Sequence, residues 1–261
     1  MLTFPERAVI AAALAFVTLS AWLGSWAITA GMEAIDPTFL AQLCARPWSA
    51  ADFANAFLMW NAMMVAMMLP SAAPMIDAFA TIAKRRRARR DPYVPTLVFV
   101  LGYLAVWGGF SLAGATGHWL MANAGLVGPD MAISNRLLSG GVLVLAGLYQ
   151  LTSVKQACLT HCRSPSGFIL SEWREGYRGS MVMGFRHGLY CVGCCWALML
   201  LMLVVSMMDL RWAAALAVYV AAEKLLPNGT LLSKVAGFCA VALGIGLFLV
   251  ELVPALSQAL R

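Results

Sequence analysis

The chain has 261 residues, of which 62% are hydrophobic and only 11% are charged, and its mean hydropathy is +0.80. A soluble protein carries about twice that charged fraction, so the composition excludes an ordinary soluble domain. The net charge of +6 does not indicate nucleic-acid binding, because the basic residues lie at the ends of apolar segments, where membrane proteins place them.

Several segments reach the ~20 apolar residues that a helix needs to cross a bilayer. Their hydrophobicity is continuous, which favours helices over a β-barrel, whose strands alternate. We expect an all-α, polytopic transmembrane bundle of about seven helices, with six as the alternative, in a single integral membrane domain over residues 1–261. In chain order the expected helices cover residues 8–30, 52–83, 94–121, 133–152, 181–208, 212–226 and 232–253.

Basic residues predict the orientation. The densest charge is the run at 84–90, which holds six Lys and Arg residues. With this run in the cytoplasm, the N-terminus is also cytoplasmic, the C-terminus is periplasmic, and most of the Lys and Arg residues lie inside, as the positive-inside rule requires. A cysteine-containing loop at about 153–180 is then cytoplasmic.

Soft ligand atoms are concentrated in residues 155–196, which hold five of the seven cysteines and two of the three histidines. An odd number of closely spaced cysteines favours metal or redox chemistry over a disulfide framework. Cys158 and Cys162 are four residues apart and share one face if this segment is helical, with His161 nearby.

The second group of soft ligands lies in the fifth expected helix, at the spacing of one helical stripe. Because a single loop joins this helix to the first cysteine pair, the thiols can meet at one membrane face. A lone cysteine packs as a small apolar residue, but five within 38 residues favour a site. Thiolates suit Cu(I), zinc or an iron–sulfur cluster. The members of the stripe are His187, Cys191, Cys194 and Cys195.

Methionines favour copper among these metals. Met63, Met64, Met67 and Met68 form two adjacent stripes on the second expected helix. Thioether sulfur is a soft ligand that suits Cu(I), whereas zinc is bound by thiolate, imidazole and carboxylate. The alternative is packing, because methionine fills irregular gaps. Two prolines at 70 and 74 predict a kink in the same helix.

Ionisable residues in apolar surroundings are further candidates. Glu223 is an acid within the membrane and therefore a functional candidate; the alternative is an interfacial pair with Lys224 that reaches toward water. Arg186 is a candidate countercharge for thiolates. Lys155 opens the first cysteine block, and His118 is expected at the membrane interface.

Five sequence blocks form a recognisable set: Met63-Met64-Val-Ala-Met67-Met68-Leu-Pro70, Tyr149-Gln150, Lys155-x-x-Cys158-Leu-x-x-Cys162-Arg163, Gly188-x-x-Cys191-x-Gly193-Cys194-Cys195-Trp196 and Glu223-Lys224. Together they resemble a bacterial family of predicted metal-binding integral membrane proteins. The resemblance spans the second to the sixth expected helix and implies metal binding in the bacterial inner (plasma) membrane, without naming a substrate or reaction.

Three functions remain open from the sequence. The first is a copper-handling protein that binds Cu(I) through Cys, His and Met and transfers it, with a soluble metallochaperone or a membrane complex as partner. The second is a membrane thiol or metal-dependent oxidoreductase, and the third is a non-catalytic subunit braced by a metal. Neither nucleotide-binding glycine motif is present, so an ATP-driven pump is not expected.

Overall fold

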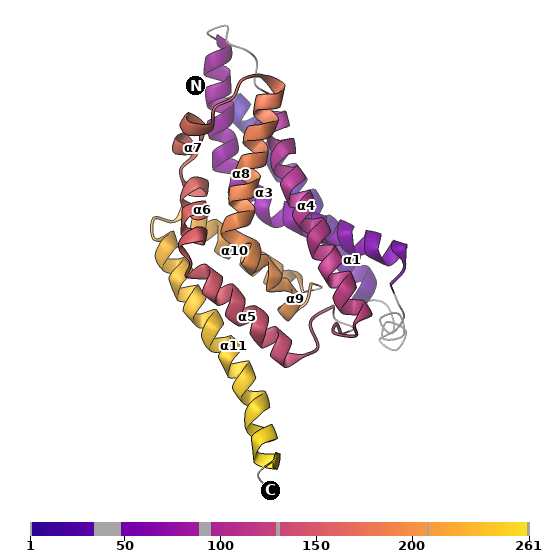
Figure 1. Cartoon of the computed structure of the whole chain (residues 1–261). Helices are drawn as coiled ribbons and strands as arrows, with labels where there is room; N and C mark the ends of the chain where they lie inside the picture. The colour runs from indigo at the N-terminus through magenta and orange to yellow at the C-terminus, as the bar shows by residue number, and fades with distance from the viewer. Residues whose placement is uncertain (1, 34–47, 89–94, 129–130, 208, 260–261) are drawn as a thin grey trace.

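Residues 2–33, 48–88, 95–128, 131–207 and 209–259 are described in the computed structural model. Within these ranges every regular element is an α-helix, and one isolated bridge joins Val127 to Ile133. The all-α prediction is therefore confirmed. The helices are α1 (Phe4–Glu33), α3 (Ala50–Ala88), α4 (Thr96–Asn123), α5 (Arg136–Gln150), α6 (Ser153–Arg163), α7 (Pro165–Glu172), α8 (Gly176–Leu200), α9 (Met202–Val205), α10 (Leu210–Leu225) and α11 (Gly229–Ala259) (Figure 1).

The number of spans differs from the prediction. In the described ranges five helices are long and apolar enough to cross a membrane, or six if α5 and α6, which meet at 63°, form one bent span. The expectation of about seven is therefore wrong in number, and the alternative of six is the upper limit. The sixth expected helix corresponds to α10, whose 16 residues extend only ~24 Å, less than the ~30 Å of a hydrocarbon core.

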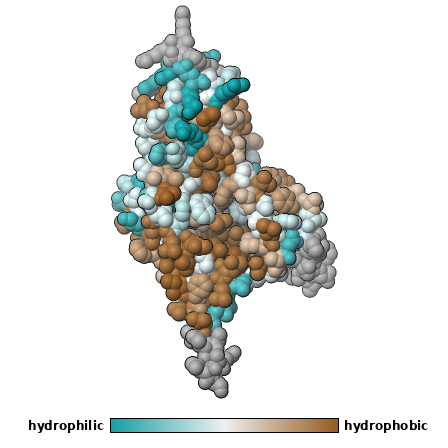
Figure 2. Space-filling model, viewed as in Figure 1, coloured by the Kyte–Doolittle hydropathy of each residue, from teal (hydrophilic) through white to brown (hydrophobic). Residues whose placement is uncertain are grey.

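The two ends of the described chain lie far apart. The start of α1 lies beside the end of α3, where Glu6 pairs with Lys84, and the end of α11 lies at the opposite end of the molecule (Figure 1). Hydrophilic residues gather at the end that holds α7, while hydrophobic residues cover α5 and α11 on the face shown in Figure 2. Residues 89 and 90 of the basic run lie outside the described residues.

Residues 153–180, expected as a loop, are largely helical. The Thr152 side chain caps α6 by accepting a hydrogen bond from the backbone N–H of Lys155 at 3.2 Å, as N-cap threonines do. Pro165 begins α7, a position where its missing N–H costs nothing. The turn formers in this stretch therefore separate short helices, and they place Cys158 and Cys162 on one helix.

The long helix α3 runs through the centre of the core. It continues through Pro70 and Pro74 and changes direction along its length (Figure 1), as expected where proline removes backbone hydrogen bonds. Near the prolines, the carbonyl of Met68 accepts a hydrogen bond from Ser71 at 2.9 Å and lies 3.0 Å from the Tyr103 hydroxyl. The Tyr103 contact ties this part of α3 to α4.

Glycines allow α4 and α8 to pack closely. A Cβ atom at Gly184 would lie 1.9 Å from the carbonyl oxygen of Phe99, and one at Gly102 would lie 2.4 Å from that of Met181. Small residues permit such backbone approach between membrane helices. This contact fixes the rotation of α8 and thereby aims its cysteine stripe at α3, α6 and α10.

Candidate metal centre

Sulfur atoms from three helices meet in the interior. Cys194 and Cys195 of α8 are each 1% exposed. The Sγ atom of Cys195 lies 3.7 Å from the Sδ atom of Met68 on α3, and the Sγ atom of Cys194 lies 3.9 Å from that of Cys162 on α6. We call Cys162, Cys191, Cys194, Cys195 and Met68 the sulfur cluster.

Cys158 lies beside this cluster on the more exposed side. A Cβ atom at Gly193 would be only 2.7 Å from the Sγ atom of Cys158, so glycine makes room for the thiol. The Tyr149 hydroxyl donates a hydrogen bond to the carbonyl of Gly193, and its ring packs edge-on against Trp196. The Gly193 position therefore sets how closely α6 approaches α8.

Cys191 has a charged neighbour. The Nζ atom of Lys224 on α10 lies 3.0 Å from the Cys191 Sγ atom and 2.9 Å from the Ser71 Oγ atom. The Tyr103 hydroxyl lies 3.2 Å from the same sulfur. The Lys224 amine donates a hydrogen bond to the Cys191 sulfur and so joins α10 to α8.

Glu223 is buried in an ion pair. Its Oε1 atom accepts hydrogen bonds from Lys155 at 2.6 Å and from the Tyr219 hydroxyl at 2.7 Å, and Lys155 also donates to Gln150. Lys155 and Glu223 are 0% and 1% exposed at their side chains. The alternative of an interfacial pair with Lys224 therefore does not hold, because both acidic and basic groups are inside the protein. This pair joins α6 to α10.

Arg186 contacts none of the cysteines that the structure describes. It pairs with Glu172 and so joins α8 to α7, and its side chain is 42% exposed. The charge beside the thiols comes from Lys224 instead. Sequence reasoning noticed Lys224 only as the neighbour of Glu223. Helix geometry is the one signal that could have indicated its role. Adjacent residues on a helix point in different directions, so Glu223 and Lys224 are expected to have different partners.

The three histidines occupy different environments. His187 is 2% exposed, stacks on Tyr103, and has a buried Nδ1 atom without a hydrogen-bond partner in the structure. His161 is exposed, stacks on Tyr190 and donates from Nδ1 to the carbonyl of Ala157. His118, expected at an interface, is buried. His187 is therefore the histidine best placed to assist the cluster, one helical turn before Cys191.

The predicted methionines all face the core. Met63, Met64, Met67 and Met68 are each at most 1% exposed, and Met68 brings its sulfur to a cysteine. Sequence reasoning missed Met199 of α8 and Met202 of α9. Both are fully buried, and Met199 continues the cysteine stripe of α8 four residues after Cys195, a spacing that was visible in the sequence.

Among the described residues, no three His, Cys, Asp or Glu side chains form a group that could hold a metal ion. A structural zinc site needs four such ligands, and an iron–sulfur cluster needs four cysteines or their equivalent. The sulfur cluster offers pairs instead: one thiol with another, and one thiol with a thioether. Such pairs suit Cu(I), which accepts soft ligands at low coordination number.

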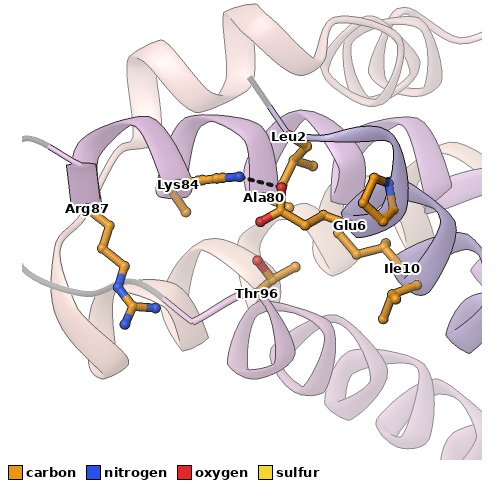
Figure 3. Close-up of a pocket in the computed structure, with 10 residues that line it drawn as sticks. Leu2, Glu6, Ile10, Ala80, Lys84, Arg87 and Thr96 are labelled. Carbon is orange, nitrogen blue, oxygen red and sulfur yellow. Dashed lines mark hydrogen bonds and ion pairs between the residues drawn. The ribbon is translucent and has the colours of Figure 1, made fainter.

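A surface pocket lies elsewhere. It has a volume of about 430 Å³, lies among α1, α3 and α4, and is lined by residues that include Glu6, Lys84 and Thr96 (Figure 3). The carboxylate of Glu6 and the amine of Lys84 point toward each other across it. None of its lining residues belongs to the sulfur cluster, so it is not the metal centre.

The comparison with protein families shows which family the chain belongs to. Residues 57–247 match the model of the PpoB2 family, which is described as a copper chaperone. The chain belongs to this copper chaperone family. The matched range extends from α3 into α11 and contains the whole sulfur cluster. No curated protein and no solved structure matches the chain.

Proposed function

We propose that this protein binds Cu(I) inside the membrane at the sulfur cluster and passes it to an acceptor by ligand exchange. The observation that carries the proposal is the 3.7 Å contact between the Cys195 thiol and the Met68 thioether. A thiol beside a thioether is a soft pair that suits Cu(I) and not zinc. Membership of a copper chaperone family supports copper as the cargo.

The burial of the sulfur atoms suggests an order of contact. Cys158 and Cys162 on α6 are half-buried, whereas Cys194 and Cys195 are buried. Cu(I) from a donor such as a soluble metallochaperone would first meet the α6 thiols. It would then move to the α8 thiols and to Met68, where the remaining methionines of α3 extend the soft path into the core. His187 is the nitrogen ligand in this scheme.

The same proposal includes an orientation in the bacterial inner membrane. The cytoplasmic end is the one where α1 begins and α3 ends with its basic residues, and the periplasmic end is where α11 ends. This assignment is supported by the apolar helices and by the preference of Lys and Arg for the cytoplasmic side. It places the α6 thiols toward the cytoplasm and the methionine path toward the periplasm. The acceptor would then be a periplasmic protein or a membrane complex.

One contact favours a second function. The 3.9 Å separation of the Cys162 and Cys194 sulfur atoms would let the two thiols close to a disulfide after a small movement, since bonded sulfurs lie about 2 Å apart. The two electrons and two protons released would pass to an external two-electron acceptor. A membrane thiol oxidoreductase would use this pair reversibly. Counting free thiols before and after mild oxidation separates the two functions, because a copper carrier needs both thiols reduced.

Metal analysis of the full chain, purified in detergent under reducing conditions with added copper, tests the main proposal. We expect copper in the wild type and its loss in a Cys194→Ser/Cys195→Ser double variant. A Cys158→Ser/Cys162→Ser double variant should load copper more slowly. The matched control is Cys239→Ser, an exposed cysteine on α11, which should keep its copper. Copper-free wild type would refute the proposal.

A further inference from the structure

The pocket among α1, α3 and α4 changes from apolar to basic along its length. Its lining residues on α3 have the spacing of a single helical stripe, and in chain order they are Ala80, Ala83, Lys84 and Arg87. The two basic residues lie near the end of α3, and the alanines lie further back along the helix (Figure 3). The stripe extends over about 10 Å, so apolar and basic walls are within reach of one small molecule.

The facing wall on α1 has the same polarity. Glu6 pairs with Lys84 at the basic end. Val9 and Ile10 line the pocket about one turn further along α1, toward the alanines of α3. Thr96, the first residue of α4, adds a hydroxyl group to the lining. The pocket therefore has an apolar end inside the helices and a polar end where α1 begins and α3 ends.

The size and the opening of the pocket fit a lipid. Its volume of about 430 Å³ falls within the ~300–1,000 Å³ of small-molecule sites. At its apolar end the side chain of Val9 is 68% exposed. In a membrane such a side chain contacts acyl chains, which are as apolar as the side chain itself. The apolar end is therefore open to the bilayer, where lipid is already present.

The charges of the lining favour an anionic headgroup. Lys84 and Arg87 are positive and Glu6 is negative, so the lining carries a net charge of one positive unit. The two basic residues belong to the run at 84–90, which directly follows the apolar part of α3. Basic runs at this position attract anionic lipids of the cytoplasmic surface, and arginine binds phosphate oxygens with two parallel hydrogen bonds.

Resting on the membrane placement proposed above, we propose that this pocket binds one anionic phospholipid of the cytoplasmic leaflet. Its phosphate is bound by Lys84, Arg87 and the Thr96 hydroxyl, and an acyl chain lies along the apolar end. Most of α1 is exposed, so a lipid between α1 and α3 adds contacts where the protein itself provides few. None of the lining residues belongs to the sulfur cluster, so this site is separate from the copper site.

Native mass spectrometry of the full chain in a neutral detergent tests the proposal by counting bound lipids. Dioleoylphosphatidylglycerol is compared with dioleoylphosphatidylcholine, which has the same acyl chains but no net charge, and with inorganic phosphate. We expect one phosphatidylglycerol per chain, at least about fivefold weaker binding of phosphatidylcholine, and no displacement by millimolar phosphate. Arg87→Gln should weaken phosphatidylglycerol binding about fivefold, the contribution of one basic residue near an anionic headgroup.

Two matched controls separate the pocket from its surroundings. Arg85 is an exposed residue of the same basic run that does not line the pocket, so Arg85→Gln should bind phosphatidylglycerol like the wild type. Val9→Trp fills the apolar end from an exposed position and should abolish binding. Val17 is exposed on α1 outside the pocket, so Val17→Trp should keep it.

Four results would overturn the proposal. Equal affinity for the two lipids, or equal loss in Arg85→Gln and Arg87→Gln, would show diffuse attraction to the basic run. Displacement by inorganic phosphate would assign the pocket to a free anion, and a dimer that Val9→Trp abolishes would assign it to a second copy of the chain. Copper per chain is measured in the same samples and should be unchanged in all four variants. Copper-free wild type would refute the copper proposal alone, because lipid binding is counted independently.

Discussion

Replacing Lys155 by methionine would leave the Glu223 carboxylate buried without its cation. Both side chains are at most 1% exposed, so water cannot take the place of the missing partner. Breaking a buried pair by removing one partner costs about 3–5 kcal/mol. We therefore expect Lys155→Met to lower the free energy of unfolding by about that amount. The hydrogen bond from Tyr219 to Glu223 remains in this variant, so we expect the loss of stability to lie near the lower end of that range.

The double variant Lys155→Met/Glu223→Gln separates lost charge from lost packing. Glutamine keeps an oxygen that can accept the Tyr219 hydrogen bond but carries no charge. We expect this variant to recover most of the loss and to cost less than about 2 kcal/mol, because removing both charges of a buried pair is often nearly neutral.

Chemical denaturation of the detergent-solubilised variants, followed by tryptophan fluorescence, measures these differences. The control is the pair of Arg136 and Glu251, whose side chains are 66% and 42% exposed. Exposed pairs contribute at most about 1 kcal/mol, so Arg136→Met should be almost silent. If Lys155→Met costs no more than Arg136→Met, or if the double variant is as unstable as the single one, the account of this ion pair is wrong.

Three further predictions concern the sulfur cluster and its supports. Gly193→Val should push α6 from α8, because a side chain at 193 overlaps the Cys158 sulfur, and copper bound per chain should fall in metal analysis. Met68→Leu should lower Cu(I) affinity about tenfold in chelator competition while costing under about 1.5 kcal/mol in stability, since the two side chains have similar volumes. Gly184→Ala should destabilise the chain by about 1–3 kcal/mol in denaturation, because its methyl group would overlap the Phe99 carbonyl.

Each of these has a matched control. Gly246 and Gly109 have nothing within 4 Å of an added Cβ atom, so Gly246→Val and Gly109→Ala should leave copper binding and stability close to wild type. Met75 is buried on α3 outside the sulfur cluster, and Met75→Leu should keep full Cu(I) affinity. Equal effects of a test variant and its control would show that the named contact is not the cause.

Apolar length was sufficient to predict the helical class. Continuous hydrophobic segments of about 20 residues leave few alternatives, because every backbone group must be satisfied in lipid. The number of spans could not be predicted in the same way. The segment of α10 is strongly apolar but too short to cross the membrane. The sequence of α5 and α6 does not show that the chain bends between these two helices. The bend at Leu151 depends on the Thr152 cap, which is a local feature that hydrophobicity does not reveal.

The cysteine faces could be predicted because helical spacing is a property of the local sequence. Cys194 and Cys195 do point into the core, and Cys162 does approach them. The partners of Glu223 and Cys191 could not be predicted in the same way. Glu223 and Lys224 are adjacent in sequence, but one turns to Lys155 on α6 and the other to Cys191 on α8. Tertiary packing determines which of the neighbouring helices each side chain contacts.

X-ray absorption at the copper edge of the Cu(I)-loaded protein tests the central claim most directly. The account predicts a low-coordinate shell made mainly of sulfur, which disappears in Cys194→Ser/Cys195→Ser and loses one sulfur in Met68→Leu. A shell of nitrogen and oxygen, or a sulfur shell that is unchanged in both variants, would contradict it.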